Sequence, residues 1–368
     1  MRQKRFLLKA YFKEYNEFSR QLLEKYYAAR KDQNLIFSPF SILMMLAIAA
    51  DATAGNTRDE IAGVLSSEMN YEETLSVLKE IQKAFAEDAA FSSANAVCVN
   101  SKIEKSIVPT YAAHIQEQFG GELFSSSDIV SDVNAWVKKN TRGMIDKVAD
   151  DSMRNMLACL MNATAFDGKW TKHYTRNDID YKEFHNSDGT IKETAMLDIS
   201  EREYVENDSF TGFVKPYKDI GFSFMALLPK KKSAVGMRLA LHSLDFSELF
   251  SSRTGERVVV ALPEFKYSSG EDLTSYCKEL GIEELFTDHA DFTPLSSEWL
   301  KMAAIIHKAR IEVDRHGTKA AAVTMGIVCA GAAPRFDYKI VELDRPFVYA
   351  IMHNETGLPV FTGVVNML

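Results

Sequence analysis

The chain has few cysteines for its length, and none is spaced for a metal site or a redox motif. Only four occur in 368 residues, at Cys98, Cys159, Cys277 and Cys329, and no CxxC pair is among them. Metal centres and disulfide-rich scaffolds need closer cysteine spacing than this. We therefore expect free thiols, no metal and no other cofactor.

Linkers, repeats and excess positive charge are also lacking. The 9 prolines and 18 glycines are not gathered into a flexible linker, and no repeat or low-complexity tract is present. We predict one domain over residues 1–368, although the length alone would allow two or three. The net charge of −8 argues against a general affinity for nucleic acid.

No apolar run near the N-terminus is long enough for a membrane span, and the segment is too charged for a signal peptide. Residues 5–30 instead predict an amphipathic helix, because apolar side chains recur at helical spacing, at Phe6, Tyr11, Tyr15, Phe18 and Leu22. Two interpretations stay open: the protein remains in the cell, or a leader was removed.

The catalytic motifs GxSxG, HExxH and the P-loop are missing. By residue type alone, Ser38, Ser41 and His307 could form a hydrolase with an acid. We predict instead that Ser38 caps a buried helix starting at Pro39 and that Ser41 lies inside that helix. His307 lies in an apolar strand predicted over residues 302–311, where a hydrogen-bonded core histidine is commoner than a general base. We therefore predict that the chain is not an enzyme.

What the sequence does contain is an unusual run of small residues between Gly317 and Pro334. With a period of two, one face from Thr318 to Val328 carries no charge and little bulk, while the other face begins with Lys319. Residues 330–334 are typical of an exposed segment that a protease can enter. The stretch suits both a surface loop and a buried strand, and composition alone does not choose between them.

Motifs along the chain resemble those of the serpins, the serine protease inhibitor superfamily, in the family's order. A short strand at residues 35–37 and the helix after it begin the match; Gly55 and Thr57 follow, with Ala52 where a glycine is usual. Later matching motifs cover residues 93–96, 133–137, 160–163, 166–170, 216–217, 223–229, 262–265, 280–282, 290–292, 345–347 and 361–363. The resemblance covers nearly everything from Asn34 to the end.

The resemblance implies an α+β serpin fold, with eight or nine helices around three β-sheets and an exposed reactive loop at about residues 315–338. The hinge of that loop would comprise Gly317, Thr318, Lys319, Ala320, Ala321 and Ala322. About 14 inserting residues at ~3.3 Å each would span ~46 Å, the length of a long strand. The uncharged face suits insertion, since a buried unpaired charge costs several kcal/mol.

The function implied is that of a suicide substrate, which traps a serine protease as an acyl-enzyme when the cleaved loop inserts into the central sheet. Family spacing places the scissile bond after Gly331; the loop is longer than the shortest familiar version, so Ala330, Ala332 and Ala333 are alternatives. Such small residues favour an elastase-like or subtilisin-like target. Arg335 would suit a trypsin-like enzyme but follows Pro334, too far from the hinge. A non-inhibitory carrier or chaperone of the same fold is the alternative function.

Two further groups of residues take roles from the resemblance. The first is a hydrogen-bonded cluster beneath the sheet, where the sheet opens, and it comprises Ser38, Ser41, Asn162 and His307. The second is a set of contacts at the top of the sheet: Trp170, Glu264 and Arg315. The charges at the last two positions are reversed relative to most inhibitory members, which predicts a swapped ion pair; two unrelated surface charges are the alternative.

The oligomeric state, the compartment and the kind of source are further expectations. We expect a monomer that is secreted, since the chain lacks the long N-terminal extension and paired cysteines of many animal members. This pattern favours a microbial, bacterial form. The cytoplasm is the alternative compartment.

Overall fold

The computed structural model describes residues 2–172, 174–302, 305–318 and 338–368. Within these ranges the chain forms nine α-helices: α1 (Arg2–Ala29), α2 (Pro39–Asp51), α3 (Gly55–Leu65), α4 (Tyr71–Ala86), α5 (Tyr111–Phe119), α6 (Ile129–Asn140), α7 (Ala234–His242), α8 (Phe246–Ser251) and α9 (Thr274–Glu279). Short 3₁₀ helices are η1 (Ser101–Ser106), η2 (Asp151–Met153), η3 (Arg176–Asp178) and η4 (Glu284–Phe286). None of the helices so described has the length and apolar character needed to cross a bilayer.

The described strands are β1 (Leu35–Phe37), β2 (Phe91–Asn100), β3 (Glu122–Ser126), β4 (Ala158–Phe166), β5 (Gly168–Lys169), β6 (Ile179–His185), β7 (Ile191–Glu201), β8 (Tyr204–Glu206), β9 (Phe210–Pro216), β10 (Phe222–Pro229), β11 (Val258–Pro263), β12 (Phe265–Asp272), β13 (Ile306–Asp314), β14 (Gly317–Thr318), β15 (Lys339–Glu342), β16 (Phe347–His353) and β17 (Pro359–Val365). Their hydrogen bonds give four groups, with strand orders β1-β17-β16-β10-β9-β8, β15-β11-β7-β6, β12-β13-β14-β5 and β3-β2-β4.

The chain builds two compact units, each assembled from separate stretches. Unit 1 comprises Met1–Glu14, Phe40–Ala165 and Gly270–Ala309, and unit 2 comprises Tyr15–Pro39, Phe166–Ser269 and Arg310–Leu368. Because the chain passes repeatedly between the units, neither is a contiguous segment that could fold by itself. The expectation of a single domain over residues 1–368 stays a prediction.

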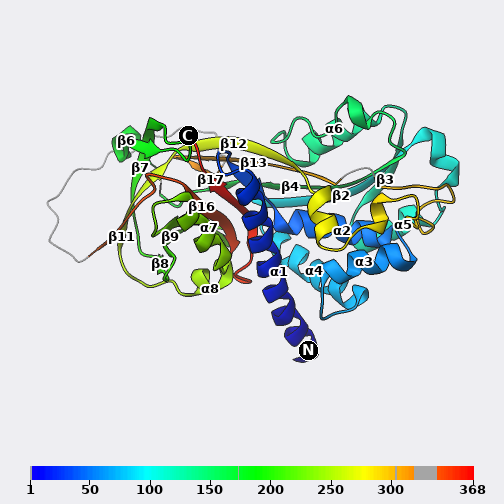
Figure 1. The fold of residues 1–368 in the computed structure, drawn as a ribbon, viewed down its shortest axis with the longest axis horizontal. Coiled ribbons are helices and arrows are strands. Elements are labelled where there is room, and N and C mark those ends of the chain that lie inside the picture. Colours follow the sequence, from blue (N-terminus) through cyan, green and yellow to red (C-terminus); the bar gives the residue numbers. More distant parts are fainter. Residues whose placement is uncertain (1, 173, 303–304, 319–337) are drawn as a thin grey trace. The chain divides into compact units, whose positions relative to one another are not determined.

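Unit 1 is organised around the β3-β2-β4 group. Figure 1 shows α6 on one side of these strands and α2, α3 and α4 on the other. The apolar stripe of α6 recurs at helical spacing. It packs against alanine and methionine side chains of β2 and β4 in one buried cluster, which includes Ile129, Val133, Trp136, Val137, Ala96, Cys98, Met161 and Ala163. Helix α4 begins at a capping box, in which Asn70 and Glu73 exchange hydrogen bonds.

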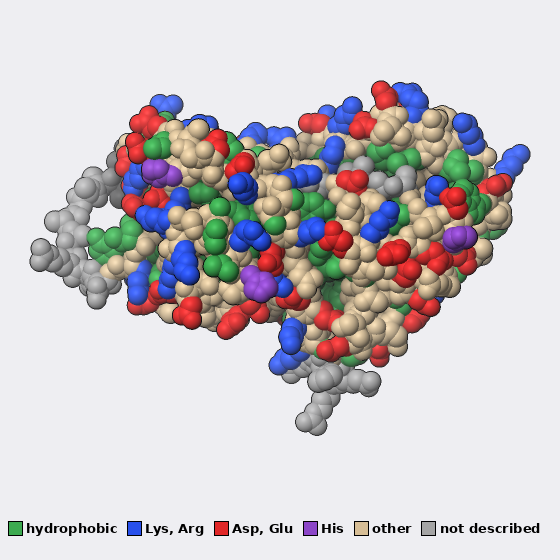
Figure 2. Space-filling model, viewed as in Figure 1, with side chains coloured by type: hydrophobic (Ala, Val, Ile, Leu, Met, Phe, Trp, Pro, Cys, Tyr) green, Lys and Arg blue, Asp and Glu red, His purple; other side chains and the backbone are tan. Residues whose placement is uncertain are grey.

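Unit 2 contains the six-stranded group and the β15-β11-β7-β6 group. All residues of β10, β16 and β17 are buried, as expected for strands with continuous apolar sequence. Strands β9 and β10 pair antiparallel, with Pro216 opposite Ser223, so the motifs at residues 216–217 and 223–229 meet. On the face shown in Figure 2, acidic and basic side chains are interspersed, and no continuous basic surface is visible there.

Three details of the predicted fold need correction: the ends of one helix, the ends of one strand, and the grouping of the strands. The N-terminal helix begins at Arg2 and ends at Ala29, and the strand predicted over residues 302–311 is Ile306–Asp314. It starts late because the Met302 N–H donates to the Leu285 carbonyl and the Ile305 N–H to Thr274 Oγ1. The third concerns the three sheets: the described strands form four groups, since β4 has only β2 as a hydrogen-bonded neighbour.

Candidate functional site

The first two residues of the predicted hinge, Gly317 and Thr318, form strand β14 in the structure. β14 pairs antiparallel with β13, where Val313 lies opposite Thr318. On its other side it pairs antiparallel with β5, where Thr318 lies opposite Gly168. The remaining hinge residues, Lys319, Ala320, Ala321 and Ala322, and the candidate cleavage residues, Ala330, Gly331, Ala332 and Ala333, lie outside the described residues.

A close approach of backbones explains why residue 317 is glycine. A Cβ atom at Gly317 would lie 2.2 Å from the carbonyl oxygen of Gly168 and 2.8 Å from Cα of Lys169. Real Cβ contacts are longer, so any side chain here would push β14 away from β5. The glycine thus lets the hinge begin between two strands.

Thr318 points into a buried polar contact. The residue is 3% exposed, and its Oγ1 lies 2.5 Å from Oη of Tyr217. This hydroxyl pair satisfies both buried polar groups, while a charged side chain here would have no partner of opposite sign among these contacts. The uncharged face predicted from the sequence therefore starts at a position that demands it.

Trp170 joins the strands on either side of the hinge. Its indole Nε1 donates to the Asp314 carbonyl at 2.7 Å, and its backbone N–H donates to the His316 carbonyl at 3.0 Å. The indole stacks on the Tyr217 ring, with centroids 4.8 Å apart and planes 4° from parallel. Trp170 is 1% exposed, so it fixes the turn between β13 and β14 from the buried side.

Glu264 and Arg315 are in contact, as the swapped-charge interpretation requires. Arg315 Nε lies 3.3 Å from Glu264 Oε1, with side chains 31% and 22% exposed. The same oxygen accepts the Arg315 backbone N–H at 3.0 Å. Asp314 Oδ1 accepts the backbone N–H groups of His316 and Gly317. These carboxylates together hold the turn that leads into β14.

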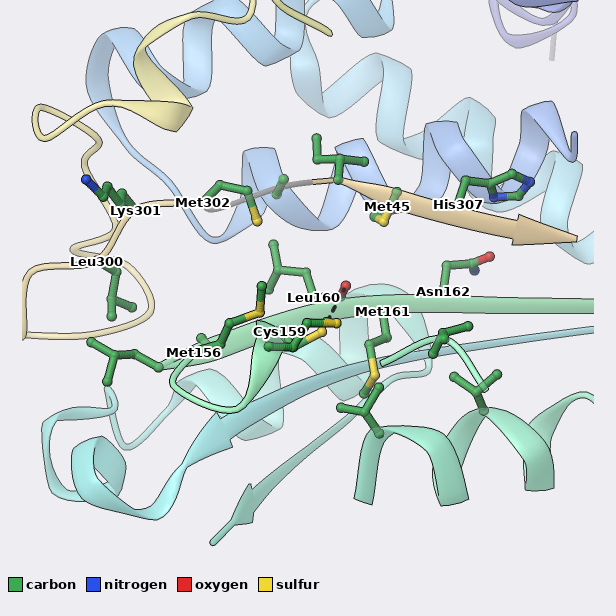
Figure 3. Close-up of a pocket in the computed structure, with 18 of the residues that line it drawn as sticks. Met45, Met156, Cys159, Leu160, Met161, Asn162, Leu300, Lys301, Met302 and His307 are labelled. Carbon is green, nitrogen blue, oxygen red and sulfur yellow. Dashed lines mark hydrogen bonds between the residues drawn. The ribbon is translucent and has the colours of Figure 1, made fainter. Parts of the chain in front are cut away.

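Three of the four predicted sheet-opening residues lie at a second site, in unit 1, whereas Ser38 belongs to unit 2. Ser41, Asn162 and His307 line a pocket of about 440 Å³. In Figure 3, Asn162 on β4 faces the side of the pocket where His307 on β13 lies. Asn162 donates to Ser93 Oγ and Asn95 Oδ1, and its own Oδ1 is buried with no hydrogen-bond partner among the described residues. Ser38 is fully buried directly before α2.

Most of the other residues that line this pocket are apolar and several contain sulfur, although Ser152, Asn155, Lys301 and Lys308 line it as well. Its lining includes Met45 from α2, Val133 and Val137 from α6, and Met156, Cys159, Leu160, Leu300 and Met302. Strand β4 borders one side of the pocket and the start of β13 another (Figure 3). Since these strands are not hydrogen-bonded neighbours in any of the four groups, the pocket occupies a gap between β4 and the first residues of β13, which belong to unit 1.

Comparison with known proteins decides the family. The family model described as "Serpin (serine protease inhibitor)" matches residues 13–367.

The chain belongs to the serpin family.

Among the relatives of this serpin is a protein named as an inhibitor. This serpin is 31% identical to glia-derived nexin of Rattus norvegicus over 94% of this chain and 90% of that protein. It is 28% identical to plasminogen activator inhibitor 1 of Sus scrofa over 95% and 90%. Accordingly, this serpin is not an enzyme, as predicted.

Solved structures share the fold. The native state of tengpin, a thermophilic serpin, is 30% identical and superposes with a TM-score of 0.83 over 91% of this chain and 89% of that one. A thyroxine-binding globulin complex with thyroxine is 21% identical, with a TM-score of 0.84 over 96% and 98%. That second likeness concerns the fold alone. The predicted mixed α+β serpin fold is confirmed.

The hydrolase interpretation gains nothing from the pocket. His307 is 5% exposed, and burial lowers its pKa to about 4, so the imidazole is a poor proton acceptor near neutrality. Ser38 and Ser41 are 0% and 3% exposed to solvent, and of the two only Ser41 lines the pocket. These residues belong to the interior of the serpin.

The described cysteines are not paired in disulfides. Cys98, Cys159 and Cys277 are free thiols, and burial raises the pKa of each to about 12. Across the described ranges, no group of three or more His, Cys, Asp or Glu side chains is arranged to hold a metal ion. Cys329 lies outside those ranges.

Sequence reasoning missed the partners that hold the hinge. Tyr217 was part of a recognised motif, but nothing local indicates that its hydroxyl meets Thr318, a residue 101 positions away. A buried pair beneath Trp170, formed by Lys215 and Glu201, was missed as well. One signal was available: Lys215 interrupts the apolar run of a central strand.

Proposed function

We propose that this serpin inhibits a serine protease as a suicide substrate. The observation that carries the proposal is the position of β14: Gly317 and Thr318 are already paired between β13 and β5. Insertion of the loop then needs no new nucleus, because the strand only has to grow from Thr318. An uncharged, buried first residue keeps the cost of that growth low.

The register indicates where the growing strand goes. Val313 lies opposite Thr318, so an unbroken antiparallel register along β13 brings Thr324 opposite His307. His307 lines the pocket between β4 and β13. The incoming strand would fill that apolar space and bring backbone N–H groups to the unpaired Oδ1 of Asn162.

The chemistry belongs to the protease. Its serine attacks a carbonyl in the loop and forms an ester, and the amine side of the cut is released. Growth of β14 then carries the ester away from the point of attack. The tethered protease is distorted before water can complete hydrolysis. This chain contributes the scissile bond, the hinge and the sheet that receives it.

Elastase-like and subtilisin-like proteases are the proposed targets. The support is residue type alone: Ala330, Gly331, Ala332 and Ala333 fit a shallow first pocket. A trypsin-like enzyme would need Arg335. We also propose, from the expectation above, that the protein is a secreted monomer; size-exclusion chromatography of culture medium from its source tests both points.

A second candidate function is that of a carrier. The pocket of about 440 Å³ in unit 1 favours it. The carrier proposal expects cleavage of the loop without a trapped complex.

The test mixes the protein with pancreatic elastase, subtilisin and trypsin separately. Inhibition predicts a covalent complex that survives boiling in SDS, and mass spectrometry of the released fragment identifies the bond. Thr318→Arg should give cleaved protein with little complex, because a buried unpaired charge slows insertion. Thr318→Val matches the native shape and should still trap protease. Loop cleavage without complex in the native chain, at any ratio, contradicts inhibition.

A further inference from the structure

A lysine is buried in the middle of unit 2. Lys215 on β9 is 2% exposed. Its Nζ donates to Glu201 Oε1 at 2.5 Å and to Tyr174 Oη at 2.7 Å. The Glu201 side chain, at the end of β7, is 16% exposed. Burial lowers the Lys215 pKa from its ordinary value, although the Glu201 carboxylate acts in the opposite direction.

The same ammonium contacts Trp170. Nζ lies 5.1 Å from the centroid of the indole and 4.8 Å from that of the Tyr174 ring. The opposing residue on β10 is Phe224, whose ring meets the indole edge to face at 5.9 Å. A cation at such a distance is attracted by the π face of the ring. Lys215 therefore helps to decide where the indole lies.

Trp170 connects this pair to the hinge in two steps. Its indole N–H holds the Asp314 carbonyl at the end of β13. Its stacking partner Tyr217 holds the hydroxyl of Thr318. A shift of the indole would thus disturb both the strand beside the hinge and the first buried hinge residue.

Packing alone does not account for a lysine here. An apolar side chain would fill the site without the desolvation cost of an ammonium and a carboxylate, and such replacements of buried pairs are often neutral or stabilising. The charged pair does supply what an apolar residue lacks: a fixed attraction to the indole and a defined geometry.

We propose that the Lys215–Glu201 ion pair positions Trp170. Through Trp170, the pair holds Gly317 and Thr318 in place between β13 and β5 and prevents further insertion until the loop is cut. The effect on Trp170 is independent of the proposed inhibitory function. The consequence for loop insertion rests on that function, so the two are tested separately.

The first experiment observes Trp170 directly. The full chain is labelled with fluorotryptophan, and the fluorine NMR signals of Trp136, Trp170 and Trp299 are followed with pH. The Trp170 signal should titrate as Lys215 loses its proton, below the usual range of lysine. In Lys215→Met it should be shifted and flat. A native Trp170 signal that does not titrate, or one unchanged by Lys215→Met, overturns the proposal.

Other charged groups near the pair are controlled for. Glu201 faces it from β7, while Lys172 precedes η3 and contacts Asp178 within it. Burial, with Glu201 and Asp178, raises the pKa of Tyr174, so its phenol stays protonated in the range observed. Lys172→Met should leave the titration in place, and its loss in that variant would assign the titration to Lys172 and overturn the proposal. Glu201→Gln provides a second disruption if Lys215→Met does not fold.

The second experiment measures how fast the intact protein loses its ability to trap a protease. Lys215→Met and Glu201→Gln should lose trapping activity on storage about tenfold faster than the native chain, through premature insertion. Lys230→Met is the matched control, because it breaks an exposed pair between Lys230, directly after β10, and Glu206 on β8. Equal rates in all variants overturn the link to insertion. If no variant or native chain traps a protease, the proposed function fails, and the NMR result alone then decides the role of the pair.

Discussion

At the scale of single residues, burial decides what a titratable group can do in this serpin. His307 is 5% exposed, and desolvation lowers its pKa from 6.5 to about 4. The folded chain therefore keeps the imidazole neutral over a range in which the unfolded chain protonates it. Protonation and folding are linked through this difference.

We expect the free energy of unfolding to fall as pH drops from 6.5 to 4. In this window the unfolded chain binds a proton at His307, whereas the folded chain does not. The contribution of His307 to the free energy of unfolding is therefore complete above pH 6.5 and is lost on acidification. The fall in the His307 pKa from 6.5 to about 4 corresponds to about 3 kcal/mol of stability. Urea unfolding of the native chain and of His307→Gln measures it. Parallel pH curves for the two proteins would contradict the assignment.

At the scale of elements, the turn between β13 and β14 is held by side chains from outside it. Glu264 follows β11, yet it accepts both the Arg315 side chain and the Arg315 backbone N–H. Glu264 is therefore more than one member of an ion pair. The swapped charges predicted from the sequence explain the first contact, and only the structure reveals the second.

A double-mutant cycle separates these two contributions. Arg315→Glu places two carboxylates together and should loosen the turn, which polymer formation on warming would report. Glu264→Lys with Arg315→Glu restores the attraction, so we expect a coupling energy of about 0.2–1 kcal/mol for this partly exposed pair. The double variant should recover only part of the native stability, since a lysine at position 264 cannot accept the hydrogen bond from the backbone N–H of residue 315. Urea unfolding supplies the energies, and zero coupling would remove the pair.

For the molecule as a whole, the informative feature is a pocket that the strands leave unfilled in the intact chain. β4 and β13 border one pocket without pairing among the described residues. A strand added along β13 would gain a ladder of hydrogen bonds and bury apolar surface on both sides. The intact chain would then be less stable than the same chain after cleavage and insertion.

Cleavage of the loop should therefore raise the midpoint of thermal unfolding. If insertion contributes on the order of 10 kcal/mol, the midpoint of this 368-residue chain rises by roughly 10–15 °C. Calorimetry before and after limited proteolysis measures the change. Thr318→Arg, cleaved in the same way, is the control and should show little rise. A native chain whose unfolding curve is unchanged by cleavage would count against insertion.

The sequence by itself determined which elements form and which family the chain belongs to. Ser38-Pro39 starts α2 at Pro39, the apolar spacing of residues 129–137 makes one face of α6, and ordered motifs from Asn34 onward indicated the serpins. These signals are local, because capping, periodicity and turn chemistry depend on neighbours within a few residues. The opposite charges at Glu264 and Arg315 were a longer-range inference, which only the resemblance made available.

Tertiary structure decided how distant residues meet around the hinge. Tyr217 reaches Thr318, and Lys215 lies beneath Trp170 with Glu201 as its partner. No local pattern encodes these contacts, because each depends on strands brought together by the whole sheet arrangement. The state of His307 was settled in the same way, since its pKa follows from burial by residues far along the chain.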